Sequence, residues 1–72
     1  MIASDEVIDL SFEIKLLIEQ KGHRIDDFYV GSLENGGISF SKRGVVIELH
    51  NSGDILYNKV RYKTIQDIIW EK

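Results

Sequence analysis

The residues of this 72-residue chain that could do chemistry are two histidines and a few carboxylates. Glu48 and His50 are two residues apart, and alternate residues of a strand point to the same side, so Glu48 could hold His50 as a general base. Asp26 and Asp27 could supply half of a metal site. His23 is the only other histidine. Each of these groups lacks the further ligand or nucleophile that a working site requires.

A structural interpretation therefore fits these residues better than a catalytic one. We interpret His50 as a solvated loop histidine and the Asp26–Asp27 pair as a solvated turn or cap. The chain has no cysteine, which excludes thiolate metal sites and disulfides. It also has no P-loop, GxGxxG, HExxH or GxSxG motif. The sequence thus predicts no enzyme, no cofactor and no metal site.

Composition and charge indicate a small globular protein. The hydrophobic fraction of 43% and the charged fraction of 29% are ordinary for a folded domain. No apolar run is long enough to span a membrane, and the acidic N-terminus does not resemble a signal peptide. The net charge of −3 disfavours unselective binding to nucleic acid. We expect a complete cytoplasmic protein with a single domain, residues 1–72.

The first predicted element is a helix from Ser4 or Asp5 to Lys21. Ser4 is a good N-cap, and Gly22 stands where a left-handed residue would end the helix. At helical spacing the apolar residues form two separate stripes. The first stripe is Val7, Leu10, Ile14, Leu17 and Ile18, and the second is Ile8, Phe12 and Leu16.

The second stripe is the most informative feature of the sequence, because one sheet face can cover only one stripe. The C-terminal segment could cover it, and Trp70 of that segment is grouped with the stripe for this reason. Alternatively, a second copy of the chain or another protein covers it, since exposed apolar surface on a small protein usually marks an interaction site.

The centre of the fold is predicted to be an antiparallel meander within Ile38–Tyr62. Apolar and polar residues alternate there, and glycines close each expected hairpin loop. Four-residue loops place Leu33 opposite Ile38, Phe40 opposite Val45 and Ile47 opposite Leu56. A three-residue loop with a bulge would slip the pairing, and we prefer the four-residue loops. The predicted core face is then Tyr29, Leu33, Ile38, Phe40, Val45, Ile47, Leu49, Leu56, Val60 and Tyr62.

The complete prediction is an α+β fold in the order α-β-β-β-β-α. Four strands begin near Phe28, and the N-terminal helix packs on them. Thr64 and Asp67 resemble a capping box, which predicts a short C-terminal helix ending at Glu71 and Lys72.

Two functions from different classes follow from this fold. We expect a non-catalytic intracellular accessory or regulatory protein that acts through protein–protein contacts. Its contact surface is the second stripe, and its partner is a second copy, giving a homodimer, or another protein. The alternative is a nucleic-acid-binding module on the outer sheet face. One aromatic side chain would stack on nucleobases there, and three basic side chains would contact phosphates. Those residues are Tyr57, Lys59, Arg61 and Lys63.

Overall fold

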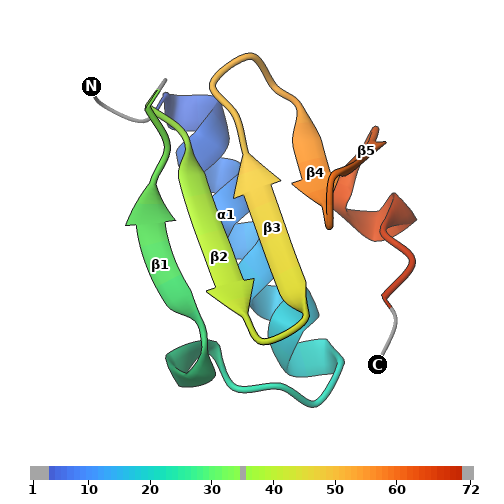
Figure 1. Ribbon diagram of the computed structural model, residues 1–72. Coiled ribbons are helices and arrows are strands. Elements are labelled where there is room, and N and C mark those ends of the chain that lie inside the picture. Colours follow the sequence, from blue (N-terminus) through green and yellow to red (C-terminus); the bar gives the residue numbers. More distant parts are fainter. Residues whose placement is uncertain (1–3, 35, 71–72) are drawn as a thin grey trace.

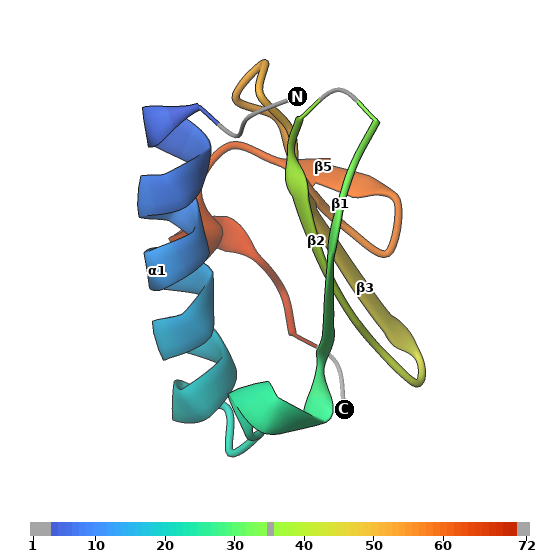
Figure 2. The same ribbon diagram turned by 90° about the vertical axis from the view of Figure 1, so that its left-hand side faces the viewer.

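The computed structural model describes residues 4–34 and 36–70, and it confirms the α+β class. A single α-helix, α1 (Asp5–Gln20), lies across one face of a five-stranded antiparallel sheet (Figures 1 and 2). Strands that follow one another in sequence are neighbours in the sheet. The strands are β1 (Tyr29–Ser32), β2 (Ile38–Lys42), β3 (Val45–Leu49), β4 (Ile55–Tyr57) and β5 (Val60–Tyr62), and two 3-10 turns are η1 (Ile25–Asp27) and η2 (Ile65–Asp67).

Helix α1 begins and ends close to where its local signals predict. The Ser4 hydroxyl accepts a hydrogen bond from the Val7 N–H at 3.2 Å, as an N-cap does. The Ser4 N–H donates to Asn51 Oδ1 at 3.0 Å, which ties the start of the helix to the β3–β4 loop. At the other end Gly22 has a φ of +83°, the left-handed conformation that terminates a helix.

The core lies between α1 and the sheet, with β3 at its centre. Ile47 and Leu49 of β3 are fully buried, which confirms the predicted burial of Ile47. They face the first stripe of α1, where Val7, Ile14 and Ile18 are also fully buried. The remaining core side chains come from the end of η1, from β2, β3 and β4, and from the C-terminal segment: Phe28, Phe40, Val45, Ile55, Tyr57, Ile65 and Ile68.

The β2–β3 hairpin has a shorter loop than predicted. Lys42 pairs with Val45, so Arg43 and Gly44 alone form the loop, and Phe40 lies opposite Ile47. Gly44 has a φ of +81°, so the glycine was correctly assigned to the turn. Because the register differs by two residues, each side chain of β2 and β3 still points to the predicted face.

In the other two glycine-containing connections the predicted faces change. Beyond the last strand pairs, the Leu33 N–H donates to the Gly37 carbonyl and the His50 N–H to the Asp54 carbonyl, so each of these hydrogen bonds encloses three residues. Ser32 pairs with Ile38, and Leu49 pairs with Ile55, so each register differs by one residue from the prediction. A one-residue shift moves every side chain to the opposite face. Tyr29 therefore lies on the outer face, 74% exposed, and Leu56 also points outward. Ile55 and Tyr57 point into the core instead.

A fifth strand exists because a tight turn divides the segment predicted as one strand. Asn58 and Lys59 both have positive φ, 51° and 73°, which is the conformation of a two-residue type I′ turn. The Asn58 amide supports the turn, because its Oδ1 accepts from the Val46 N–H at 2.7 Å and its Nδ2 donates to the Gly44 carbonyl at 3.2 Å. The turn contains no glycine, and Asn58 alone is a weaker turn signal than the Asn-Gly pair typical of such turns.

The C-terminal segment forms the single 3-10 turn η2 in place of the predicted short helix. Thr64 makes no side-chain cap, and residues 68–70 after the turn are not helical. Ile65 and Ile68 are nevertheless buried against the core. A helix as short as the predicted one is stable only when it packs on other elements. Ile65 and Ile68 already pack on the core, so these contacts do not require a helix. The predicted helix end at Glu71 and Lys72 lies outside the described residues.

Candidate functional site

The second stripe of α1 is exposed. Ile8, Phe12 and Leu16 are 39%, 59% and 62% exposed, and the helical period places them on the side of α1 away from the buried Val7, Ile14 and Ile18. The Lys15 ammonium lies 5.4 Å from the centre of the Phe12 ring, a cation–π contact that leaves most of the ring open. We call this surface the outer stripe, and none of the described residues buries it.

The C-terminal segment packs beside the outer stripe and does not cover it. The buried Ile65 of η2 lines one hollow with Leu17, on the core side of α1, and with Leu16, at the end of the outer stripe, which is still 62% exposed. Gln66 Nε2 lies 3.5 Å from Glu13 Oε1, so the segment reaches the flank of the helix. Within residues 4–34 and 36–70, the fold therefore leaves the outer stripe largely uncovered.

The electrostatic surroundings of the outer stripe are acidic. Helix α1 carries five carboxylates and one ammonium group, and all six side chains are exposed. Lys15 is the base, and the acids are Asp5, Glu6, Asp9, Glu13 and Glu19. An approaching surface meets apolar side chains in the middle of the helix and negative charge around them. This charge influences which partner can bind there.

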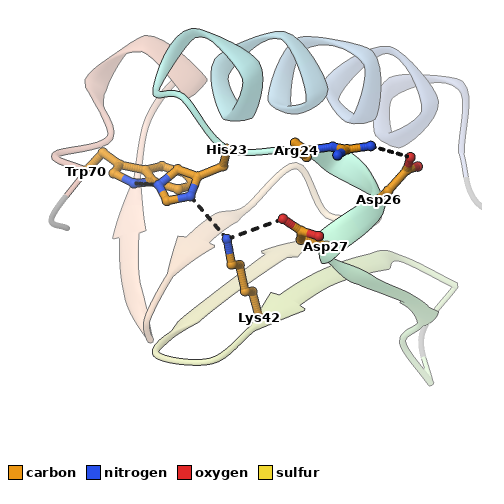
Figure 3. Close-up of polar contacts among 6 residues, drawn as sticks. All are labelled: His23, Arg24, Asp26, Asp27, Lys42 and Trp70. Carbon is orange, nitrogen blue, oxygen red and sulfur yellow. Dashed lines mark hydrogen bonds and ion pairs between the residues drawn. The ribbon is translucent and has the colours of Figure 1, made fainter.

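Trp70 does not belong to the outer stripe, contrary to its sequence-based assignment. Its ring packs against His23, with centroids 5.2 Å apart, and against Tyr57 at 5.4 Å and Phe28 at 6.5 Å. Figure 3 shows the indole beside the His23 imidazole, near the C-terminal end of α1. His23 and Trp70 are 47 residues apart, and neither sits in a periodic pattern that links them. The sequence contains no signal for this contact.

The residues assigned to a nucleic-acid face are brought together only in part, because Arg61 and Lys63 line one hollow with Asp54 whereas Tyr57 is buried. Tyr57 is only 4% exposed and points into the core, so it cannot stack on a base. The Lys59 ammonium lies 3.5 Å from Glu48 Oε2, and the Arg61 guanidinium lies 3.8 Å from Asp54 Oδ1. Lys63 is exposed beyond the end of β5.

Glu48 and His50 do lie in contact, as their spacing allows. His50 Nε2 is 3.1 Å from Glu48 Oε1, and the Glu48 side chain is 16% exposed. The hydrogen bond from His50, followed by the charge of Lys59, holds the pKa of Glu48 below its usual value of 4.5, although partial burial opposes this. His50 and Lys59 both stabilise the charged form of the Glu48 carboxylate, which therefore holds these two side chains together on the outer sheet face.

Within the described part of the chain, no three His, Cys, Asp or Glu side chains gather as a metal site. Of the described helices, none is long and apolar enough to cross a membrane. Comparisons of this chain with protein-family models, with curated proteins and with solved structures found no match.

Proposed function

We propose that this chain is a small, non-catalytic, cytoplasmic accessory or regulatory protein that acts through protein–protein contacts. Its contact surface is the outer stripe of α1. The observation that supports the proposal is the exposure of Ile8, Phe12 and Leu16 as neighbours on one helix face. Burying side chains of this size stabilises an interface by roughly 1.5–3 kcal/mol each. A helix that offers three apolar side chains in a row is a common form of protein recognition.

The favoured partner in this proposal is a second copy of the chain. A two-fold axis near Phe12 would set two antiparallel outer stripes against each other, and two-fold dimers are the commonest assemblies. Such a dimer also brings the five carboxylates of each α1 close to those of its partner. Their repulsion weakens the dimer at low ionic strength, and salt screens it.

Another protein is the second possible partner, and the salt dependence of the complex distinguishes this partner from a second copy of the chain. A protein with lysines or arginines around an apolar patch would complement the acids of α1, and salt would then weaken the complex. Self-association through the outer stripe should instead become stronger as sodium chloride rises from about 0.05 M to 0.5 M, a range over which the screening length falls severalfold.

The experiment is light scattering coupled to size exclusion over a range of protein concentrations. The wild-type protein is expected to exceed the monomer mass at high concentration, and Phe12→Glu to remain a monomer. Tyr29→Glu is the matched control, because it places the same charge on an exposed aromatic position of the outer sheet face. A wild-type monomer under all conditions would exclude self-association, and loss of assembly in Tyr29→Glu alone would move the interface to the sheet.

Nucleic-acid binding receives less support as a function. The one aromatic side chain assigned to it is buried, and two of its three bases are near carboxylates. A gel shift with mixed-sequence single strands at low salt tests it. A salt-sensitive shift that Arg61→Ala abolishes would restore this alternative.

A further inference from the structure

The His23 imidazole lies between two hydrogen-bond donors. Trp70 Nε1 is 3.2 Å from His23 Nε2, and Lys42 Nζ is 3.2 Å from His23 Nδ1 (Figure 3). These two contacts join three separate parts of the chain: the connection after α1, the strand β2 and the C-terminal segment. His23, Lys42 and Trp70 are all half-buried, so water does not easily replace either contact.

The number of protons on His23 decides which contact is a hydrogen bond. An indole N–H and an ammonium group can only donate. A neutral imidazole has one lone pair, so it accepts from Trp70 when the proton is on Nδ1 or from Lys42 when the proton is on Nε2. A protonated imidazole has no lone pair. It would set an N–H against the Trp70 N–H and a second positive charge against Lys42.

The surrounding charged groups do not offer the imidazolium a direct partner. On η1, the Asp27 carboxylate is 4.0 Å from Lys42 Nζ, and the Asp26 carboxylate is 3.8 Å from the Arg24 guanidinium. Glu19 of α1 lines the hollow beside His23 and Arg24. The rings of Phe28 and Trp70 also pack against the imidazole. Among the described residues, no carboxylate forms a hydrogen bond with the His23 ring in this arrangement.

We propose that protonation of His23 and docking of Trp70 exclude each other, so that the cluster is a pH-sensitive latch for the C-terminal segment. In the neutral state Trp70 donates to His23 and packs on Phe28 and Tyr57. When His23 takes up a proton, this hydrogen bond is lost, and the new charge repels Lys42. The indole then leaves the cluster and exposes the aromatic side chains beneath it, while α1 and the sheet remain folded.

The test uses Trp70 as its own reporter, because it is the only tryptophan. Its emission maximum and its quenching by acrylamide are followed from pH 8 to pH 5, with far-UV circular dichroism as a check for global unfolding. Emission wavelength is read in preference to intensity, since an imidazolium quenches a nearby indole without any movement. The wild-type protein is expected to shift to longer wavelength and to become more accessible to acrylamide, with an unchanged circular dichroism spectrum.

Two histidine variants assign the transition. His23→Gln keeps an amide oxygen that can accept from Trp70 and cannot titrate, so its emission should stay constant across the range. His50→Gln is the matched control, because it removes the other histidine and should keep the wild-type transition. The latch is excluded if the wild-type emission does not change, or if His23→Gln shows the same transition.

A third variant keeps the test decisive if His23→Gln does not fold. Lys42→Met removes the positive charge next to His23 and releases the Asp27 carboxylate to approach the imidazolium. Both effects favour protonation, so the emission transition should move to higher pH. An unmoved midpoint in Lys42→Met would contradict the proposed coupling between His23 and its two donors.

Discussion

The two apolar stripes of α1 have similar side chains and opposite surroundings. The first stripe, called the inner stripe below, packs against the sheet and the C-terminal segment, and its Val7, Ile14 and Ile18 are completely buried. On the outer stripe, Phe12 and Leu16 keep more than half of their surface exposed. The helical period of the sequence produces both stripes, and they differ in whether another part of the fold covers them.

This difference separates what the helix does for the fold from what it offers to other molecules. Helix α1 packs on one face of the sheet, and only the inner stripe contacts that face. The outer stripe adds apolar surface without adding to the core, which is costly for solubility unless a partner uses it. Mutations on the two stripes should therefore have very different effects on stability.

The largest expected effect is on the inner stripe. Ile14→Ala should lower the free energy of unfolding by roughly 2–5 kcal/mol, because it leaves a cavity between α1 and β3. That is a large part of the stability of a domain of this size. Urea denaturation followed by circular dichroism measures the loss. A decrease below about 1 kcal/mol would mean that the inner stripe is not the main contact between helix and sheet.

A smaller effect on the free energy of unfolding is expected at Glu48, which lies on the outer face of β3. Because its pKa is lowered in the folded protein, the ion pairs stabilise the fold above pH 4.5, and this contribution is lost as the pH falls through the lowered pKa. Its size is about 1 kcal/mol, the net contribution of one typical hydrogen bond. Glu48→Gln should remove it at neutral pH.

The measurement for Glu48 is the free energy of unfolding at several pH values between 3 and 7. In Glu48→Gln, the decrease between pH 5 and pH 3 should be smaller than in the wild-type protein. Asp54→Asn is the control, since it alters the more exposed pair with Arg61 and should leave most of that decrease in place. Equal pH profiles for Glu48→Gln and the wild-type protein would show that the Glu48 pairs do not stabilise the fold.

The smallest expected effect is on the outer stripe. Leu16→Ala should change the free energy of unfolding by no more than about 0.5 kcal/mol at a concentration where the protein is monomeric. Ile14→Ala is its natural counterpart, only two residues away and on the opposite side of the same helix. If Leu16→Ala costs more than about 1 kcal/mol, part of the chain must cover Leu16 in solution.

Local signals in the sequence were enough to predict the helix and the existence of the sheet. Ser4 and Gly22 mark the helix ends by interactions within a few residues. The faces of β2 and β3 were also predicted, because a two-residue register difference preserves them. Phe12 and its neighbours were assigned to their own stripe from spacing alone, and their exposure fits that assignment.

The register at the other loops and the C-terminal contacts could not be predicted in the same way. Glycine marks a turn, but it does not say whether a loop has two, three or four residues. One residue of difference exchanged the roles of Leu56 and Tyr57. Trp70 was misplaced for another reason: its contact with His23 joins distant segments, and such contacts leave no periodic trace.

The free energy of unfolding of Phe12→Glu tests the central claim most directly. It is measured by urea denaturation at a protein concentration where light scattering gives the monomer mass for both proteins. A charge on an exposed face is tolerated, so the value should lie within about 0.5 kcal/mol of the wild-type value. A loss of about 2 kcal/mol or more, the usual result of placing a charge in a core, would show that Phe12 is buried in solution and would remove the proposed contact surface.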